Sequence, residues 1–144
     1  MYNKMIKRII YEPPVFKNFG EDYIGRRHFL TRQDEWKAKH RGKFVLSALE
    51  DTIKVWALAN AFTHSQVLSE CKVQGYILGG GDIGISDDRK KVGVSSESYD
   101  FGSLPNIVLT YYFQHFGYEV HADMNEKRIK DEKMKWFREH GIEI

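Results

Sequence analysis

Three consecutive glycines follow a short apolar run in the middle of the chain, in the sequence Leu78-Gly79-Gly80-Gly81-Asp82-Ile83. Because glycine has no Cβ, such a run permits positive φ angles and the close approach of a second backbone or a ligand. The simplest structural interpretation is a tight turn or a bulge, so we expect Gly79, Gly80 and Gly81 to form a structural loop. The triplet lacks the spacing of a P-loop and of the dinucleotide-binding fingerprint, which excludes both motifs.

Length and composition limit the class of protein. The 144 residues suit one domain with one core, and a hydrophobic fraction of 42% indicates a packed globule. The net charge of +2 gives no general attraction to nucleic acid, and no apolar run approaches the roughly 20 residues of a membrane span. With 1 cysteine and no visible signal peptide, we expect an intracellular, cytoplasmic protein.

The hydrophobic pattern predicts a single domain of the α/β (α+β) class. Residues 1–41 read as an N-terminal extension that packs on the domain through its aromatic residues, with a short helix at 31–39. Residues 42–124 form the α/β domain, and residues 125–144 contain a charged C-terminal helix. We expect strands at 43–49, 52–58, 76–78, 91–96 and 118–122, and helices from Thr63 to before Gly75, at 106–116 and at 126–140. The first two strands are joined only by the turn Glu50-Asp51, which predicts a hairpin.

A histidine near the start of the first main helix is the strongest candidate for catalysis. Thr63 is a plausible N-cap with Gln66 in the capping-box position, which places His64 in the first turn. The helix dipole lowers the pKa of an imidazole there, and a neutral imidazole serves as a nucleophile or a general base. The alternative is a partly exposed histidine with no chemical role.

A second candidate is the polar loop that follows the strand at 91–96. It contains the hydroxyl residues Ser95, Ser96, Ser98 and Tyr99, and its backbone N–H groups are suited to an anion-binding nest. An ordinary polar loop is the alternative. No histidines or cysteines have the spacing of a zinc site, so no metal is expected.

Five sequence blocks occur in an order that resembles the janus/ocnus family, the family of the protein phosphohistidine phosphatases. The resemblance covers about residues 42–122. The blocks are Lys43-Phe44-Val45-Leu46, His64 at a helix start, the glycine triplet with Ile83, Lys90-Lys91-Val92-x-Val94 and Ser98-x-x-Phe101-Gly102.

The resemblance implies an α/β (α+β) fold in which a mixed sheet is flanked by two main helices. It also implies phosphoryl transfer without a metal or an organic cofactor. It implies that His64 is the catalytic group and that Lys43 assists at the phosphate. It also implies that the loop of Ser98, Tyr99 and Asp100 donates backbone N–H groups to the phosphate.

Several positions depart from the family pattern. Asp82 stands where the family has an arginine, Asp100 stands where it has a small residue, Ser96 replaces a glycine, and Glu97 adds a carboxylate. Two unit charges about 4 Å apart interact by roughly 4 kcal/mol at an effective dielectric constant near 20. We therefore expect Asp82 and Glu97 to modify the pocket and to weaken phosphate binding.

Three functions remain open from the sequence. The first is a divergent phosphatase that hydrolyses phosphohistidine, or a related phosphoramidate, on a protein substrate. The second is a non-catalytic binding or regulatory protein that uses the extension and the acidic pocket for a protein partner. The third is an enzyme with a cationic substrate, which Asp82 and Asp100 would suit. Neither a specific nucleic acid nor a membrane is expected as a partner.

Overall fold

The segment after His40 lies inside the sheet, and its residues 44–48 are all buried. The computed structural model describes residues 7–19, 40–86 and 88–144. Strands β3 (Arg41–Leu49) and β4 (Thr52–Ala59) pair antiparallel along their whole length. Only Glu50 and Asp51 connect them, and Glu50 takes a positive φ of 55° to close the turn. The predicted hairpin is therefore confirmed.

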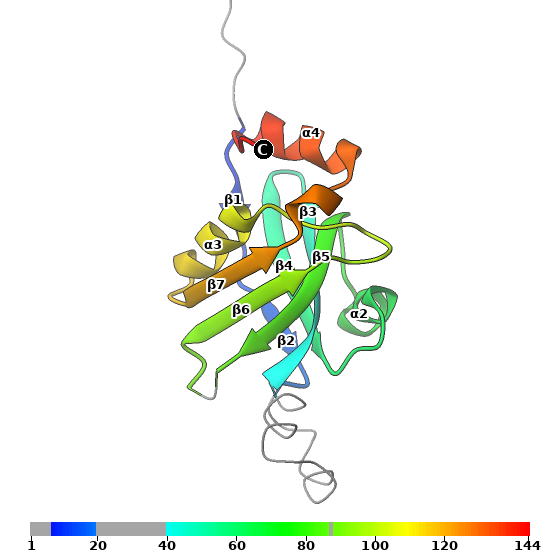
Figure 1. Ribbon diagram of the computed structural model, residues 1–144, viewed down its shortest axis with the longest axis vertical. Helices are drawn as coiled ribbons and strands as arrows, with labels where there is room; N and C mark the ends of the chain where they lie inside the picture. Colours follow the sequence, from blue (N-terminus) through cyan, green and yellow to red (C-terminus); the bar gives the residue numbers. More distant parts are fainter. Residues whose placement is uncertain (1–6, 20–39, 87) are drawn as a thin grey trace, which may run out of the picture.

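Three further strands extend the sheet beyond β3. Strand β5 (Tyr76–Ile85) pairs antiparallel with β3, and β6 (Lys91–Ser96) pairs antiparallel with β5. Strand β7 (Glu119–Met124) then pairs parallel with β6. The order across the sheet is β1-β4-β3-β5-β6-β7, with β2 also paired to β4 (Figure 1). The sheet is mixed, with helices on both sides, as the fold class predicts.

The glycine triplet lies inside the central strand β5, so its prediction as a structural loop is wrong. The β3–β5 register shifts between Leu46 and Ser47, which leaves a bulge immediately before the triplet. A Cβ on Gly79, Gly80 or Gly81 would overlap the carbonyl oxygen of Ser103, Phe44 or Ser95, respectively. These glycines are needed because neighbouring backbone passes too close for any side chain.

The N-terminal segment contributes to the sheet itself. Strands β1 (Ile10–Tyr11) and β2 (Val15–Lys17) both pair parallel with β4. The sequence analysis expected only aromatic packing here. Phe19 is indeed buried, with its ring 5.4 Å from that of Phe16. Tyr23, Phe29 and Trp36, which were also expected to pack on the domain, and the helix predicted at 31–39 lie outside the described residues.

Two helices cover opposite faces of the sheet, and a third packs at one end (Figure 1). Helix α3 (Asn106–His115) buries Leu109 and Phe113 in the main core, which also contains Phe44 and Leu46. Helix α2 (His64–Cys71) packs its Val67 on the other face. Within the described residues, no helix is long and apolar enough to cross a lipid bilayer.

The C-terminal helix is shorter than predicted. A 3₁₀ turn at Glu126–Arg128 precedes helix α4 (Asp131–Glu139), which buries Phe137 in the main core. Lys133 ties α4 to the sheet, because its buried ammonium group donates to the carbonyl of Ile77 and lies over the ring of Tyr76. Burial lowers the pKa of Lys133. Helix α4 thus packs against the strand that contains the glycines.

We predict that Tyr112→Phe destabilises the protein by about 1–3 kcal/mol. The Tyr112 hydroxyl is buried between two segments, where it accepts from the Val55 N–H and donates to the Glu12 carbonyl. Urea denaturation measures the change. The matched control is Tyr111→Phe, on the exposed face of α3. Equal effects of the two substitutions would contradict this role of Tyr112.

Candidate functional site

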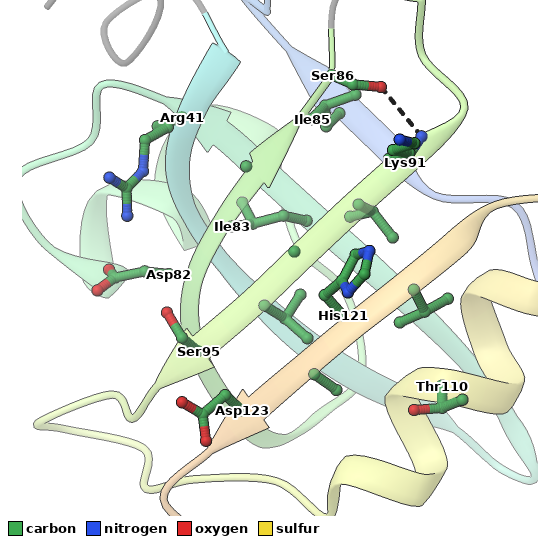
Figure 2. A pocket seen from close by; sticks show the side chains of 16 residues that line it. Arg41, Asp82, Ile83, Ile85, Ser86, Lys91, Ser95, Thr110, His121 and Asp123 are labelled. Carbon is green, nitrogen blue, oxygen red and sulfur yellow. Dashed lines mark hydrogen bonds between the residues drawn. The ribbon is translucent and has the colours of Figure 1, made fainter. Parts of the chain in front are cut away.

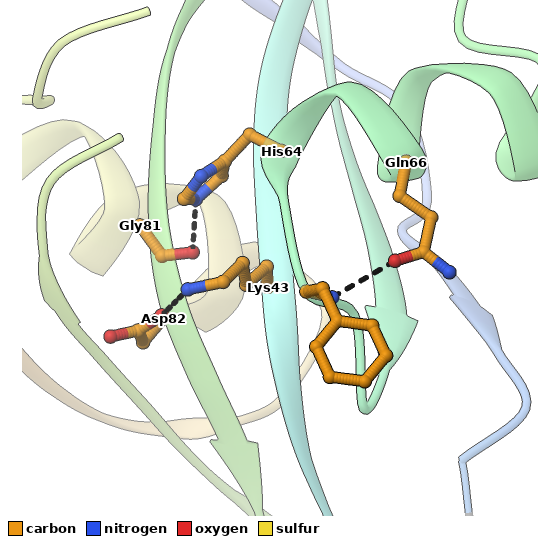
Figure 3. Close-up of polar contacts among 6 residues, drawn as sticks. Lys43, His64, Gln66, Gly81 and Asp82 are labelled. Atoms are coloured by element: carbon orange, nitrogen blue, oxygen red, sulfur yellow. Dashed lines mark hydrogen bonds and ion pairs between the residues drawn. The ribbon is translucent and has the colours of Figure 1, made fainter. Parts of the chain in front are cut away.

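The start of helix α2 is held by hydrogen bonds on both sides of His64. The Gln66 N–H donates to Oγ1 of Thr63 at 3.1 Å, which confirms Thr63 as the N-cap. The Gln66 side chain in turn accepts from the Phe62 N–H at 2.9 Å (Figure 3). His64 is therefore the first residue of a helix whose position is well determined.

The His64 ring is hydrogen-bonded to strand β5, at the last residue of the glycine triplet. Its Nε2 lies 2.9 Å from the carbonyl oxygen of Gly81, and the residue is 6% exposed (Figure 3). Because a carbonyl only accepts, Nε2 must carry the hydrogen, and the neutral ring then keeps its lone pair on Nδ1. Within the described part of the chain Nδ1 makes no hydrogen bond. The free lone pair is the one a nucleophile or a general base requires.

Burial keeps this imidazole neutral. It lowers the pKa of His64 and is the largest cause of the shift, whereas the sequence analysis attributed a lowered pKa to the helix dipole. The Gly81 carbonyl opposes the shift, Lys43 adds to it, and Asp82 and Asp100 oppose it. All three charged groups therefore lie close enough to act on the ring.

Lys43 and Asp82 form an ion pair beside His64. They are direct partners in the β3–β5 register, and Lys43 Nζ lies 3.0 Å from Asp82 Oδ1 (Figure 3). Their side chains are 27% and 36% exposed. Asp82 thus neutralises the lysine in addition to adding negative charge to the pocket, a contact that the sequence analysis did not foresee.

The three loop residues predicted to bind phosphate, Ser98, Tyr99 and Asp100, differ in their hydrogen bonds. The Ser98 N–H donates to the carbonyl oxygens of Gly80 and Gly102, at 2.9 Å and 3.1 Å, and the Ser98 hydroxyl accepts from the Phe101 N–H. Ser98 therefore fastens the loop to β5, and its N–H is already occupied. The backbone N–H groups of Tyr99 and Asp100 have no hydrogen-bond acceptor among the described residues, so these two groups remain able to bind an anion.

Two features around the candidate site could not be predicted from the sequence: one hydrogen bond to the loop and the exposure of two aromatic residues. Lys130 Nζ donates to the Asp100 carbonyl at 2.7 Å and so supports the far side of the loop. The ring of Tyr99 is 98% exposed, and that of Phe62 is 86% exposed. Their exposure follows from the tertiary structure, because an aromatic residue in a loop is equally often buried.

Glu97 lines a cavity of about 480 Å³ between the loop and the turn before α4, together with Lys127 and Arg128. It is not among the groups that shift the pKa of His64, whereas Asp82 is. Of the two carboxylates expected to modify the pocket, Asp82 is therefore the one that acts on the histidine.

The described residues contain no group of three or more His, Cys, Asp or Glu side chains arranged to hold a metal ion. Cys71, the single cysteine, is half-buried with Sγ 3.7 Å from the Ala57 carbonyl, and burial raises the pKa of its thiol. His64 is thus the described side chain best placed for chemistry.

Comparison with known proteins gives this chain no family. No family model matches it, and no curated protein matches it significantly.

We predict that His64 titrates below its usual pKa of 6.5, because burial disfavours the charged ring. Asp82→Asn should lower this pKa further, since the carboxylate stabilises the imidazolium, and Lys43→Met should raise it. Nitrogen NMR of the ring measures the titration and also reports whether Nε2 carries the proton. Shifts in the opposite directions would contradict the electrostatic account.

The same shift makes stability depend on pH. A histidine with a lowered folded-state pKa binds more protons when unfolded, so its contribution to stability is complete above pH 6.5 and is lost as the pH falls below it. The slope is at most about 1.4 kcal/mol per pH unit. It should diminish in His64→Gln, in urea denaturation measured on both sides of pH 6.5.

Proposed function

We propose that the protein hydrolyses the phosphorus–nitrogen bond of a phosphorylated protein side chain, such as phosphohistidine, without a metal ion. The observation that carries this proposal is the buried His64, whose Nε2–H is committed to the Gly81 carbonyl. A neutral imidazole with a fixed tautomer presents an unprotonated Nδ1, as attack on phosphorus requires. The resemblance of the sequence to the janus/ocnus family supports the same chemistry.

In the first step the Nδ1 lone pair of His64 forms a bond to phosphorus. The bond from phosphorus to the substrate nitrogen breaks, and that nitrogen takes up a proton from solvent. Water then attacks the phosphorylated His64, which releases inorganic phosphate and restores the neutral ring. If Nδ1 instead accepts a proton from the attacking water, the same products form in one step.

Lys43 and the loop supply the stabilisation of charge. The developing negative charge on the phosphoryl oxygens needs fixed donors, and the N–H groups of Tyr99 and Asp100 are two such donors. To bind the phosphoryl group, Lys43 must release Asp82, its ion-pair partner. Exposed ion pairs contribute only about 0–1 kcal/mol, so a phosphoryl dianion can displace the carboxylate.

Non-catalytic binding of a protein partner is the second candidate. The Lys43–Asp82 ion pair favours it, because the positive charge available for a phosphoryl group is already neutralised. The exposed rings of Phe62 and Tyr99 also favour it, since exposed aromatic residues commonly act as anchors at protein interfaces.

We predict that a phosphohistidine peptide is hydrolysed by the purified protein and that His64→Ala lowers the rate at least about 100-fold. Release of phosphate in the presence of a chelator measures it. His115→Ala, an exposed histidine on α3, is the matched control and should retain full activity. Activity that survives in His64→Ala would exclude this mechanism, and absence of turnover in both proteins would favour the binding function.

A second prediction concerns the carboxylate beside Lys43. Asp82→Asn should lower the KM for the phosphorylated peptide several-fold, and Asp82→Arg should lower it further, because each change frees or adds positive charge. The effect should weaken as salt is raised. Glu70→Gln, on the exposed side of α2, serves as the control. An unchanged KM in both Asp82 variants would show that Asp82 does not oppose the phosphoryl group.

A further inference from the structure

Among the described residues, the sheet face that holds the Lys43–Asp82 pair is only half covered. Helix α2 packs over β3 and β4 on this face, and the face continues past it onto β5, β6 and β7. Residues paired directly across neighbouring strands project from the same face. In the described structure, those on this part of the face are half-buried or exposed: Asp82, Gly84, Gly93, Ser95, His121 and Asp123.

A groove lies over this uncovered face. Its volume is about 810 Å³, and Asp82, Ser95, His121 and Asp123 are among its lining residues (Figure 2). This size falls within the roughly 300–1,000 Å³ of typical ligand sites. Because Asp82 also pairs with Lys43, the groove is continuous with the candidate active site.

Two paired glycines form part of the groove, and the fold itself does not require them. A Cβ on Gly93 would find its nearest neighbour, the His121 carbonyl oxygen, at 3.8 Å, and one on Gly84 would lie 3.5 Å from Arg41 Cγ. Neither glycine has a positive φ. They differ in this from Gly79, Gly80 and Gly81, so the lack of side chains here leaves room for another molecule.

The residues that carry charge differ between neighbouring rows of the groove. In one row across the sheet, the carboxylates of Asp82 and Asp123 flank Ser95, and Lys43 lies beyond Asp82 as its ion-pair partner. In the next row, Arg41 and His121 flank the two glycines (Figure 2). Within the described residues neither Asp123 nor Arg41 has an ion-pair partner. Adjacent rows lie two residues apart along a strand, about 6.6 Å, which is also the spacing of alternate side chains in an extended peptide.

We propose that this groove binds an extended segment of the phosphorylated protein substrate, with a lysine or arginine of that segment beside Ser95, between Asp82 and Asp123. An acidic residue two positions farther from the phosphorylated residue then lies near Arg41 and His121. This inference rests on the proposed function, because the phosphoryl group of the same chain reaches His64. It assigns substrate preference to residues that do not contact the reacting atoms.

The test compares two synthetic phosphohistidine peptides and one small substrate, phosphoramidate. In the first peptide, the phosphohistidine is followed on each side by a lysine and, two positions farther out, by a glutamate. In the second peptide the lysines and the glutamates are exchanged. We expect the first peptide to have a KM about tenfold lower, the change that corresponds to 1.4 kcal/mol. Phosphoramidate measures the basal activity without occupying the groove.

Two variants locate the preference in the groove. Gly93→Val fills it with a side chain that the strand accommodates, and should raise the KM for the lysine-proximal peptide while leaving turnover of phosphoramidate unchanged. Asp123→Lys should reverse the preference between the peptides. Glu143→Lys, an exposed site near the C-terminus, makes the same change of charge as a control. If Gly93→Val and Asp123→Lys both show the wild-type KM values for the two peptides, the proposal is wrong.

A binding measurement tests the groove independently of the proposed function. Unphosphorylated versions of the same peptides are titrated into the protein, and shifts of the Gly84, Gly93 and Ser95 amide signals are followed by NMR. Preferential shifts with the lysine-proximal peptide, without turnover of any substrate, would support the groove and overturn the hydrolase. Turnover of phosphoramidate and of both peptides, without preference and without shifts at these amides, would overturn the groove and leave the hydrolase standing.

Discussion

The close packing around strand β5 determines the geometry of the whole candidate site. Other parts of the chain approach Gly79, Gly80 and Gly81 so closely that no side chain fits there. Two carbonyl groups of this bare backbone then hold the two functional elements: that of Gly81 accepts from His64, and that of Gly80 accepts from the Ser98 N–H. A helix start and a loop, 34 positions apart in sequence, are thereby aligned on one strand. The loss of conformational entropy on ordering three glycines is offset by this packing.

The chemistry of the site depends on which charges remain unpaired. His64 is neutral because it is buried, whereas Lys43 stays half-exposed and pairs with Asp82. An arginine at position 82 would give two cations for a phosphoryl group, while the aspartate leaves a pair with no net charge. The aspartate still serves the imidazole, because it counteracts part of the pKa decrease caused by burial. One carboxylate thus weakens the attraction for anions and preserves part of the basicity of the histidine.

Local signals in the sequence predicted the local structure well. The hairpin β3–β4 and the N-cap at Thr63 depend on neighbouring residues, and both are confirmed. The glycine triplet was predicted to form a loop because glycine permits positive φ angles. The crowding that explains glycine within a strand comes instead from residues distant in sequence. Strands β1 and β2, of two and three residues, are too short to show any periodicity. The Lys43–Asp82 contact requires the β3–β5 register across 39 positions, which no pattern in the sequence specifies.

The two sets of glycines in the central sheet show how packing and function can be told apart. At Gly79, Gly80 and Gly81 an added Cβ collides with backbone, so the fold alone explains the residue type. At Gly84 and Gly93 it meets nothing closer than 3.5 Å, and both residues have ordinary strand conformations that other amino acids adopt freely. A valine at either position would favour the strand. Glycine there gives up that stability and opens the face beside Asp82, which leaves room for the proposed segment of a substrate protein.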